Sequence, residues 1–381
     1  MGFVRSLLAL FLALLVSGVS TSAVLILPPP TPQDPLAPKI LSSKGQSLDP
    51  VFSPDGRFIA YSSNVSGDFD IWLVDVNGRH QAKLTSMLGD ERKPQFSPDG
   101  KKVAFIHSSK AGEDIWVVNR NGSNPVKVTN SHTLINVFEW SPQSGLIVYD
   151  AFSNGIWNIW ITDVSGGLTK RIGLVGNCYD PSWSHDGSSI VFVRETEQVY
   201  SLDVVDVFAA SFRQMFSTTQ KIRFPKFSND DKRIFFLQSV YGSWSIFVTT
   251  PQLGDTRDLL EAPPGGLTAL SWKPLVTEDC LFRQRPKGNE IIFTGYSIEG
   301  VADLFLVIEN ATIALSAGAF KILASGTSVD RLTEEGYSKI FGLVWSPEGD
   351  KISFAAVNDS MPSIIVVKQY SKTAQFSLYG R

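Results

Sequence analysis

The sequence predicts an all-β fold, a β-propeller of four-stranded antiparallel blades, and two observations support that prediction. First, an aromatic residue followed by a tight-turn motif returns at intervals of 43 to 45 residues through most of the chain. Second, the residues between the copies form short apolar runs bounded by Gly, Pro, Asn and Asp, and stretches with helical spacing are scarce. Short strands at such a period are typical of propeller blades and argue against a helical solenoid.

The turn motif marks the start of each predicted blade. Its best copies, residues 52–56 and 96–100, read Phe-Ser-Pro-Asp-Gly. The proline presets a backbone angle, the aspartate can bond the local backbone and the glycine accepts a positive φ, so the motif suits a corner between two strands. Further copies begin at Trp140, Trp183, Phe227, Trp272 and Trp345. Seven copies predict seven blades, and six blades with one aberrant unit is the alternative.

The first unit shows the four expected strands. Residues 50–53 form the inner strand, 58–62 the second, 70–75 the third and 81–85 the outermost. Asn77-Gly78 is a hairpin signal between the last two strands. The third strands carry aromatic residues that we expect to fill the space between stacked blades: Trp72, Trp116, Trp160, Phe247 and Phe305.

Closure of the ring is expected from the two ends of the propeller. Residues 39–42 lie where a preceding outer strand should be, and we expect them to complete the last blade beside residues 351–355 and 363–367. Residues 375–378 compete for the same position.

The sixth unit is irregular. Trp272 and Ile291 are 19 residues apart, whereas Phe52 and Ile59 are 7 apart, and a second excess follows Phe305. We therefore expect one insertion between the first and second strands and another between the third and fourth, both on one face of the disc. A partner-binding role for this protrusion is a hypothesis.

The pattern of charged and apolar residues at the N-terminus predicts that the protein is exported. Arg5 precedes the apolar run 7–16 and a small, mostly polar stretch, so residues 1–23 are interpreted as a signal peptide or an uncleaved membrane anchor. Residues 24–38 form a stiff Pro-rich linker, which leaves 39–381 for the propeller. The expected location is extracytoplasmic: secreted, periplasmic or tethered to the outer side of a membrane.

Composition narrows the chemistry. The net charge of −3 and the absence of a long basic run exclude nucleic acid as a partner. The two cysteines, Cys178 and Cys280, give no metal-ligand spacing, and a disulfide between them stays open. No pair among the four histidines has metal spacing either, so no metal and no cofactor is expected. His185 replaces a turn proline and is interpreted as structural, as are the recurrent turn aspartates.

If a small ligand binds, propeller geometry places it near the central channel, at the loops that lead into the inner strands. These loops carry mixed charge, which makes them the candidate ligand-binding site. Their candidate residues are Asp90, Glu91, Arg92, Lys93, His132, Asn136, Asn177, Asp180, Arg223 and Lys339.

The repeats resemble those of TolB-type propellers, relatives of WD-type repeats. The shared pattern is the aromatic-Ser-Pro-Asp-Gly turn, an Ile-Ala-Phe/Tyr strand, Asp-Ile-Trp, Asp-x-x-Gly and Leu-Thr, matched nearly whole by residues 52–85 and 96–129. The resemblance covers most of residues 40–370. It implies an exported propeller that works mainly through protein contacts, here without the separate N-terminal α/β domain of the bacterial translocation protein of that name.

The function expected from these observations is a non-enzymatic binding or scaffold module at the cell envelope, with a protein or peptide partner. No catalytic set is evident, and no Gly-x-Ser-x-Gly elbow accompanies the repeats. The alternative is a propeller hydrolase or lyase that acts on glycans at the central channel, which would need a convergent carboxylate or metal cluster. A membrane tether and the oligomeric state stay open.

Overall fold

The structure is a computed structural model, and it describes residues 39–40, 45–240, 243–250, 256–259, 281–286, 288, 290–296, 302–308, 329–331, 339–358 and 361–368. All of them belong to the second of two units of the chain, residues 38–381. The N-terminal segment, Cys280 and Phe305's side chain lie outside the described part. Within that part, no helix is long and apolar enough to cross a membrane.

The described strands form seven four-stranded antiparallel sheets, which we number as blades 1 to 7 along the chain. Blade 1 contains β2 (Ser47–Phe52), β3 (Phe58–Ser63), β4 (Asp70–Asp75) and β5 (Ala82–Lys83), and blade 2 contains β6 (Asp90–Phe96), β7 (Lys102–Ser109), β8 (Gly112–Asn119) and β9 (Val126–Lys127). Blade 3 contains β10 (Leu134–Trp140), β11 (Leu146–Ser153), β12 (Ile156–Asp163) and β13 (Thr169–Arg171). Blade 4 contains β14 (Asn177–Trp183), β15 (Ser189–Thr196), β16 (Val199–Asp206) and β17 (Phe212–Thr218). Blades 5 to 7 are β18 (Ile222–Phe227), β19 (Ile234–Val240), β20 (Ser243–Thr249) and β21 (Thr256–Asp258); β22 (Phe282–Gln284), β23 (Glu290–Tyr296), β24 (Ala302–Ile308) and β25 (Val329–Arg331); and β26 (Lys339–Trp345), β27 (Lys351–Asn358), β28 (Met361–Lys368) and β1 (Lys39–Ile40).

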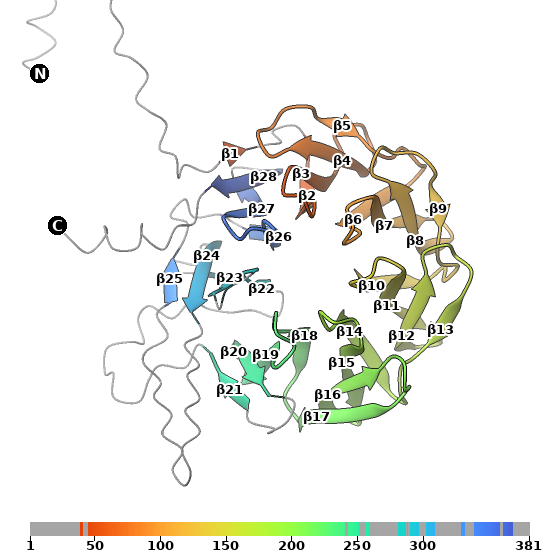
Figure 1. Cartoon of the computed structure of the whole chain (residues 1–381), viewed down its shortest axis with the longest axis vertical. Coiled ribbons are helices and arrows are strands. Elements are labelled where there is room, and N and C mark those ends of the chain that lie inside the picture. Colours follow the sequence, from red (N-terminus) through yellow and green to blue (C-terminus); the bar gives the residue numbers. More distant parts are fainter. Residues whose placement is uncertain are drawn as a thin grey trace, which may run out of the picture. The chain divides into compact units, whose positions relative to one another are not determined.

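These sheets are arranged as the blades of a propeller. Figure 1 shows the first strand of each blade at a common centre and the last strand at the rim. The inner strands of neighbouring blades contact one another, as β26 with β2 and β2 with β6. The predicted all-β propeller of four-stranded antiparallel blades is therefore confirmed.

The ring closes with a strand from the opposite end of the domain. β1 pairs antiparallel with β28, with Lys39 opposite Val366 and Ile40 opposite Ile365. The prediction that the N-terminal strand completes the last blade is confirmed. The competing segment, residues 375–378, lies outside the described residues.

The core lies between the blades, because each second strand is covered on both faces by its neighbours. The middle of these strands carries a buried aromatic residue in every blade: Tyr61, Phe105, Tyr149, Phe192, Phe236, Phe293 and Phe354. Burial of one such side chain stabilises the fold by about 1.5–3 kcal/mol relative to exposure. The predicted third-strand aromatics pack more loosely. Trp72, Trp116, Trp160 and Phe247 are half-buried against these cores.

The sixth blade corrects the sequence interpretation. Its inner strand is β22, with Gln284 opposite Ile291, so seven residues separate the two positions as in the first blade. The corner follows at once: the sequence there reads Arg285-Pro286-Lys287-Gly288, and Gly288 N–H donates to Arg285 O over 3.2 Å. Trp272 therefore does not end the inner strand. No insertion separates strands one and two of this blade.

Of the two segments of extra residues in blade 6, the second lies between the third and fourth strands as predicted, and the first lies elsewhere. One segment connects β21 to β22, before the inner strand, and the other connects β24 to β25. Since neighbouring strands are antiparallel, these two connections leave from opposite edges of the blade. The expectation that both protrude on the same face is wrong. The sequence interpretation failed because it required an aromatic residue before the turn, whereas Gln284 holds that position here and Pro286 and Gly288 suit the corner.

Corner turns of successive blades contact one another around the ring. The repeated aspartate closes its own turn: Ser53 Oγ donates to Asp55 Oδ1 (2.5 Å), and Arg57 N–H donates to the same oxygen (3.1 Å). A Cβ at Gly100 would touch the ring of Pro54 from the preceding blade, and one at Gly56 would touch Pro347. The other links, in ring order, are Asp99 N to Ser144 Oγ, Gln143 Nε2 to Asp186 O, His185 N to Asp231 Oδ1, Asn229 N to Gln284 Oε1 and Arg285 Nε to Gly349 O.

Candidate functional site

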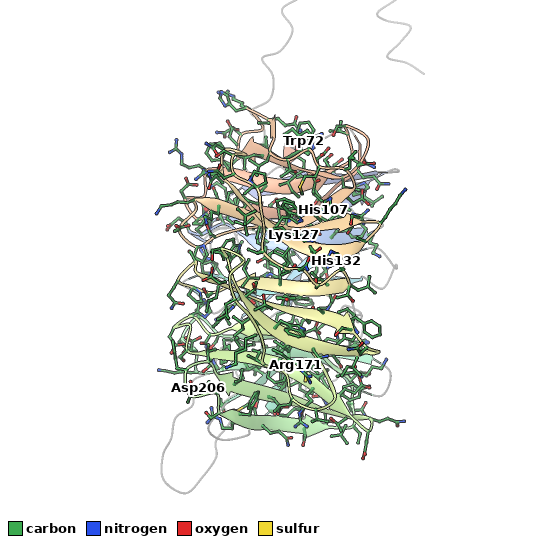
Figure 2. The ribbon with its side chains drawn as sticks, turned by 90° about the vertical axis from the view of Figure 1, so that its right-hand side faces the viewer. Trp72, His107, Lys127, His132, Arg171 and Asp206 are labelled. Carbon is green, nitrogen blue, oxygen red and sulfur yellow. The ribbon has the colours of Figure 1, made fainter. Side chains whose placement is uncertain are left out.

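The propeller has two different faces. Connections between strands one and two, and between strands three and four, leave from one edge of each blade, which we call the turn face. Connections between strands two and three, and those that lead into the next inner strand, leave from the opposite edge, the loop face. Figure 2 shows the ring edge-on, with His132 of the loop before β10 on one side and Asp206 at the end of β16 on the other. All predicted site residues except Glu91 and Asp180 are at least partly exposed near the loop face.

A β-bulge recurs in the inner strands near the loop face. The pairing register shifts within β2, β6, β10, β14, β18 and β26. In five of these strands the residue three positions before the last has a left-handed backbone: Asp49, Lys93, Asp180, Phe224 and Gly342, with φ between 50° and 54°. Such a backbone is disfavoured for residues other than glycine, so something must hold it.

Carboxylates from the preceding blade hold the bulges. A left-handed residue turns its N–H away from its own strand pair, and here that N–H reaches the neighbouring blade. Lys93 N donates to Asp49 Oδ2 (3.3 Å), Asp180 N to Asp150 Oδ2 (3.0 Å) and Phe224 N to Asp180 Oδ2 (3.1 Å). At Gly342 the neighbour is too close for any side chain, because a Cβ would lie 2.7 Å from Pro50 Cδ. These hydrogen bonds link blade 1 to blade 2, blade 3 to blade 4 and blade 4 to blade 5.

The densest part of this arrangement is a buried carboxylate network in blades 3 to 5. Asp150 on β11 is fully buried, and its Oδ1 accepts the N–H groups of Asn136 (3.1 Å) and Val137 (2.6 Å). Asn136 Nδ2 lies between the two carboxylates, 3.2 Å from Asp150 Oδ2 and 3.0 Å from Asp180 Oδ1. Arg223 completes the network, with Nε donating to Asp180 Oδ2 at 2.6 Å.

Burial raises the pKa of two carboxyl groups near the bulges. Burial, together with the neighbouring Asp180 carboxylate, raises the pKa of Asp150 to about 6. Burial likewise raises the pKa of Asp49 above its usual range, although Lys93 opposes this effect. A carboxyl group that titrates near neutral pH marks a functional candidate, but structural networks perturb pKa values in the same way.

Two further side chains meet across the inner strand of blade 4. Lys226 on β18 lies 2.7 Å from Glu139 Oε2 on β10, although β14 stands between these strands in the ring. Ser182, at the corresponding position of β14, is small enough to leave this path open. The centre of blades 3 to 5 is therefore filled by polar groups that bond to one another.

The structure brings together four of the ten predicted residues: Lys93, Asn136, Asp180 and Arg223. Lys93 joins the network through Nζ, which donates to Asn136 O at 2.6 Å. Arg223 also stacks on Phe224, with its guanidinium carbon 4.4 Å from the ring centroid. Whether these residues bind a ligand stays a prediction.

The other predicted residues lie in separate places. Asp90 accepts Phe69 N–H (3.1 Å) and pairs with Arg92 (2.9 Å), whose guanidinium lies over the Phe69 ring. Asn177 accepts Trp157 N–H (3.1 Å) and so fixes a loop. Lys339 lies over Phe341, with Nζ 5.1 Å from the ring centroid.

His132 and Glu91 belong to the strand ends of blades 1 and 2. His132 Nε2 lies 3.3 Å from Lys127 Nζ, which pairs with the buried Asp114. Glu91 is fully buried and accepts Thr85 Oγ1 (2.8 Å). Burial, followed by the nearby Asp70 carboxylate, raises the pKa of Glu91 to about 7.

Asp150 and Asp49 were missed by the sequence reasoning. A signal for Asp150 existed, since it interrupts the apolar run of β11, a strand covered on both faces. The bulge in β2 positions Asp49, and no pattern in the sequence of β2 indicates that bulge.

No group of three or more His, Cys, Asp or Glu side chains suited to a metal ion occurs in the part of the chain that the structure describes. His185 uses the N–H that a proline would lack: it donates to Asp231 Oδ1 at 2.8 Å, which supports its structural interpretation. Cys178 is a buried free thiol whose pKa burial raises to about 11.

The exposed apolar side chains favour the loop face. Among the described residues, six of the ten exposed large apolar side chains lie in loop-face connections or at the strand ends beside them: Val65, Leu88, Leu134, Ile156, Val175 and Val199. Leu88 and Val175 lie just before β6 and β14, Leu134 is the first residue of β10, and these three side chains are 91%, 84% and 59% exposed. They surround the entry to the strands that carry the network.

Repeated four-stranded blades, corner turns of one chemistry and closure by the N-terminal strand define a repeat propeller. The TolB beta propeller domain matches residues 35–276, and the chain belongs to this family. No curated protein matches the chain.

Solved structures share the fold at low identity. An oligogalacturonate lyase from Vibrio parahaemolyticus is 11% identical, with a TM-score of 0.63, over 88% of this chain and 94% of that chain. The β-propeller domain of the Trilobed protease from Pyrococcus furiosus is 15% identical, with a TM-score of 0.58, over 85% and 96%. Hydrazine synthase from Kuenenia stuttgartiensis is 16% identical, with a TM-score of 0.59, over 86% and 97%. These likenesses concern the fold alone.

Proposed function

We propose that this chain is a non-enzymatic, extracytoplasmic propeller that docks a protein or peptide partner on its loop face. The observation that carries the proposal is the exposure of three apolar side chains, Leu88, Leu134 and Val175, at or just before the start of three consecutive inner strands. Neighbouring apolar side chains left in water, with polar groups around them, are characteristic of protein recognition surfaces. The charged pair of Asp90 and Arg92 lies beside Leu88 in the sequence and supplies the polar surround.

The turn face differs in a way that favours the loop face as the docking surface. Its corner residues bond to the next corner around the ring, so their polar groups are engaged within the propeller. A partner on that face would meet groups that already hold the blades together, whereas loops tolerate variation and carry function.

The extracytoplasmic location rests on the family and on the apolar N-terminal segment of the sequence. Mass determination of the mature protein tests it: loss of about the first 23 residues supports a cleaved signal peptide. Retention of the segment together with membrane fractionation supports a tether. A full-length protein in the cytosol would contradict both forms.

Site-specific photo-crosslinking tests the partner. A photoreactive residue at Leu88 or Leu134 should give a discrete crosslinked protein in cells that express the chain. Leu168 is the matched control, because it is an equally apolar, 72% exposed side chain on the turn face. Equal crosslinking from Leu168, or none from Leu88 and Leu134, would refute the proposal.

The glycan alternative is tested with the same protein. One neighbour in fold is an oligogalacturonate lyase, and a propeller lyase would act on its substrate at the centre of the ring. Release of unsaturated sugar from oligogalacturonate, measured by ultraviolet absorbance, would replace the binding proposal with an enzymatic one.

A further inference from the structure

Cationic residues predominate among the exposed charged residues at the start of the inner strands. We consider the four positions that lie six to three residues before the last residue of each inner strand, in the six blades where they are described. Six of these residues are exposed, and four of the six are cationic: Gln46, Arg92, Lys93, Leu134, Lys221 and Lys339. The side chain of Asp90 is also 38% exposed, and it pairs with Arg92. We call Arg92, Lys93, Lys221 and Lys339 the cationic rim. The whole chain carries a net charge of −3, so the rim is a local reversal of its balance.

The acidic residues at the same level are used inside the propeller. Asp180 is buried and bonded to Arg223, Glu91 is fully buried, and Asp49 accepts Lys93 N–H. Asp90 is the partly exposed exception, and it pairs with Arg92. Because burial and internal bonding remove these carboxylates from the surface, they leave the rim with an excess of positive charge toward solvent.

Aromatic rings lie beside two of the four cations. Arg92 lies 4.4 Å from the centroid of Phe69, and Lys339 Nζ lies 5.1 Å from that of Phe341. A ring attracts a cation through its quadrupole, so the cation still attracts an anion from the other side. The rim is therefore a set of partly ordered positive groups.

We propose that the partner's docking segment is an acidic peptide that carries apolar residues among its Asp and Glu side chains. This inference rests on the proposed function and names the chemistry of that partner. Its carboxylates meet the cationic rim, and its apolar side chains meet Leu88, Leu134 and Val175. Complementary charge of this kind speeds association and selects the partner more than it adds affinity.

The arrangement favours a polymer over a single anion. The rim residues come from blades 2, 5 and 7, on different sides of the common centre in Figure 1. One small anion contacts only neighbouring groups, whereas an extended chain reaches several blades. The exposed apolar side chains between the charges favour a peptide over an anionic glycan, since uronate sugars offer no apolar side chain to bury.

Binding of labelled poly-L-glutamate, followed by fluorescence anisotropy at low and high salt, tests the charge requirement. The variant Lys221→Glu with Lys339→Glu should weaken binding about tenfold, since two attractive exposed charges become repulsive. The matched control is Lys170→Glu with Lys232→Glu, which makes the same charge change at exposed positions on outer strand β13 and on the turn face. The control should stay within about twofold of the wild type.

Three results would overturn the inference: equal weakening in both double variants, equal binding of poly-L-lysine, or no binding of poly-L-glutamate at low salt. Tighter binding of polygalacturonate than of poly-L-glutamate would overturn it in favour of an anionic glycan. The crosslink from Leu134 distinguishes a failure of the acidic-segment inference from a failure of the proposed function. A discrete crosslinked protein that survives the Lys221→Glu and Lys339→Glu changes leaves the docking face valid and refutes the acidic segment. Binding of poly-L-glutamate without any crosslinked protein refutes the protein partner instead.

Discussion

Replacing Asp180 with asparagine tests whether the carboxylate network holds the blades together. Oδ2 accepts Arg223 Nε (2.6 Å) and Phe224 N (3.1 Å), while Oδ1 accepts Asn136 Nδ2 (3.0 Å). Asparagine has the same shape but only one acceptor oxygen. Whichever way its amide is oriented, its NH₂ group faces donors, so at least one existing bond is replaced by a donor–donor contact.

The size of the effect follows from burial. The Asp180 side chain is 1% exposed and that of Arg223 is 23% exposed, so the lost charge-assisted bond alone contributes about 1.5–3 kcal/mol. A displaced buried donor adds about 1–3 kcal/mol, and partial solvent access at Arg223 reduces the sum. We expect Asp180→Asn to lower the free energy of unfolding by about 2–4 kcal/mol.

Asp90→Asn is the matched control, because it makes the same change in an exposed pair. Asp90 and Arg92 are 38% and 44% exposed, so the expected loss is about 0–1 kcal/mol. Urea denaturation followed by tryptophan fluorescence measures both variants under one set of conditions. If the two variants lose the same free energy of unfolding within about 0.5 kcal/mol, the network does not stabilise the contacts between blades and the reasoning is refuted.

Three further predictions concern single positions. Gly112→Ala should destabilise the fold by at least about 2 kcal/mol, since a Cβ would lie 2.3 Å from the carbonyl carbon of His132, whereas Gly67→Ala has nearly the same φ (122° against 121°) and open space. Comparable denaturation midpoints for the two variants would contradict this. His185→Pro restores the usual turn residue yet should cost about 1 kcal/mol, because the N–H to Asp231 is lost; His185→Ala keeps that N–H and should retain its midpoint. Glu91 has a pKa of about 7 in the folded protein, above its usual value of 4.5, so the folded state binds its proton more tightly and stability falls as pH rises from 4.5 through 7. Glu91→Gln should lack that part of the fall, and a wild-type-to-variant difference that is equal at pH 5 and pH 8 would count against it.

The local part of the fold was predictable from the sequence because the corner turns depend on a few neighbouring residues. Ser53, Asp55 and Gly56 bond among themselves and to the adjacent backbone, so the motif forms the same turn wherever it recurs. Ring closure was predictable too, since a blade that lacks an outer strand needs one from the other end of the chain.

The sixth blade shows where this reasoning stops. The sequence interpretation followed the aromatic residue and chose Trp272, which preserves the period. The structure instead places the corner at Arg285 to Gly288, where the backbone requirement for Pro and Gly is met and the aromatic position is held by Gln284. Spacing was a poorer guide than turn chemistry, because long connections are tolerated and corners are not easily replaced.

The candidate site was predictable in location but not in composition. Asn136, Asp180 and Arg223 stand on three different inner strands, and the order of the repeats suffices to bring those strand ends near one another. Asp150 comes from a second strand and reaches β14 of the next blade through a bulge. That contact depends on a left-handed residue whose conformation is set by the neighbouring blade, so no local sequence pattern reveals it.

The network also bears on what the propeller centre can do. To act as acid or base on a ligand, Asp150 or Asp180 would first have to release N–H donors that hold the bulges of blades 3 to 5. Each release leaves a left-handed residue such as Phe224 without the bond that offsets its backbone strain. Glu139 and Lys226 are likewise paired with each other rather than presented singly. The loop face instead presents exposed side chains outside this network, such as Lys221 and Leu88. The bonds already made at the centre therefore support the proposed recognition at the loop face.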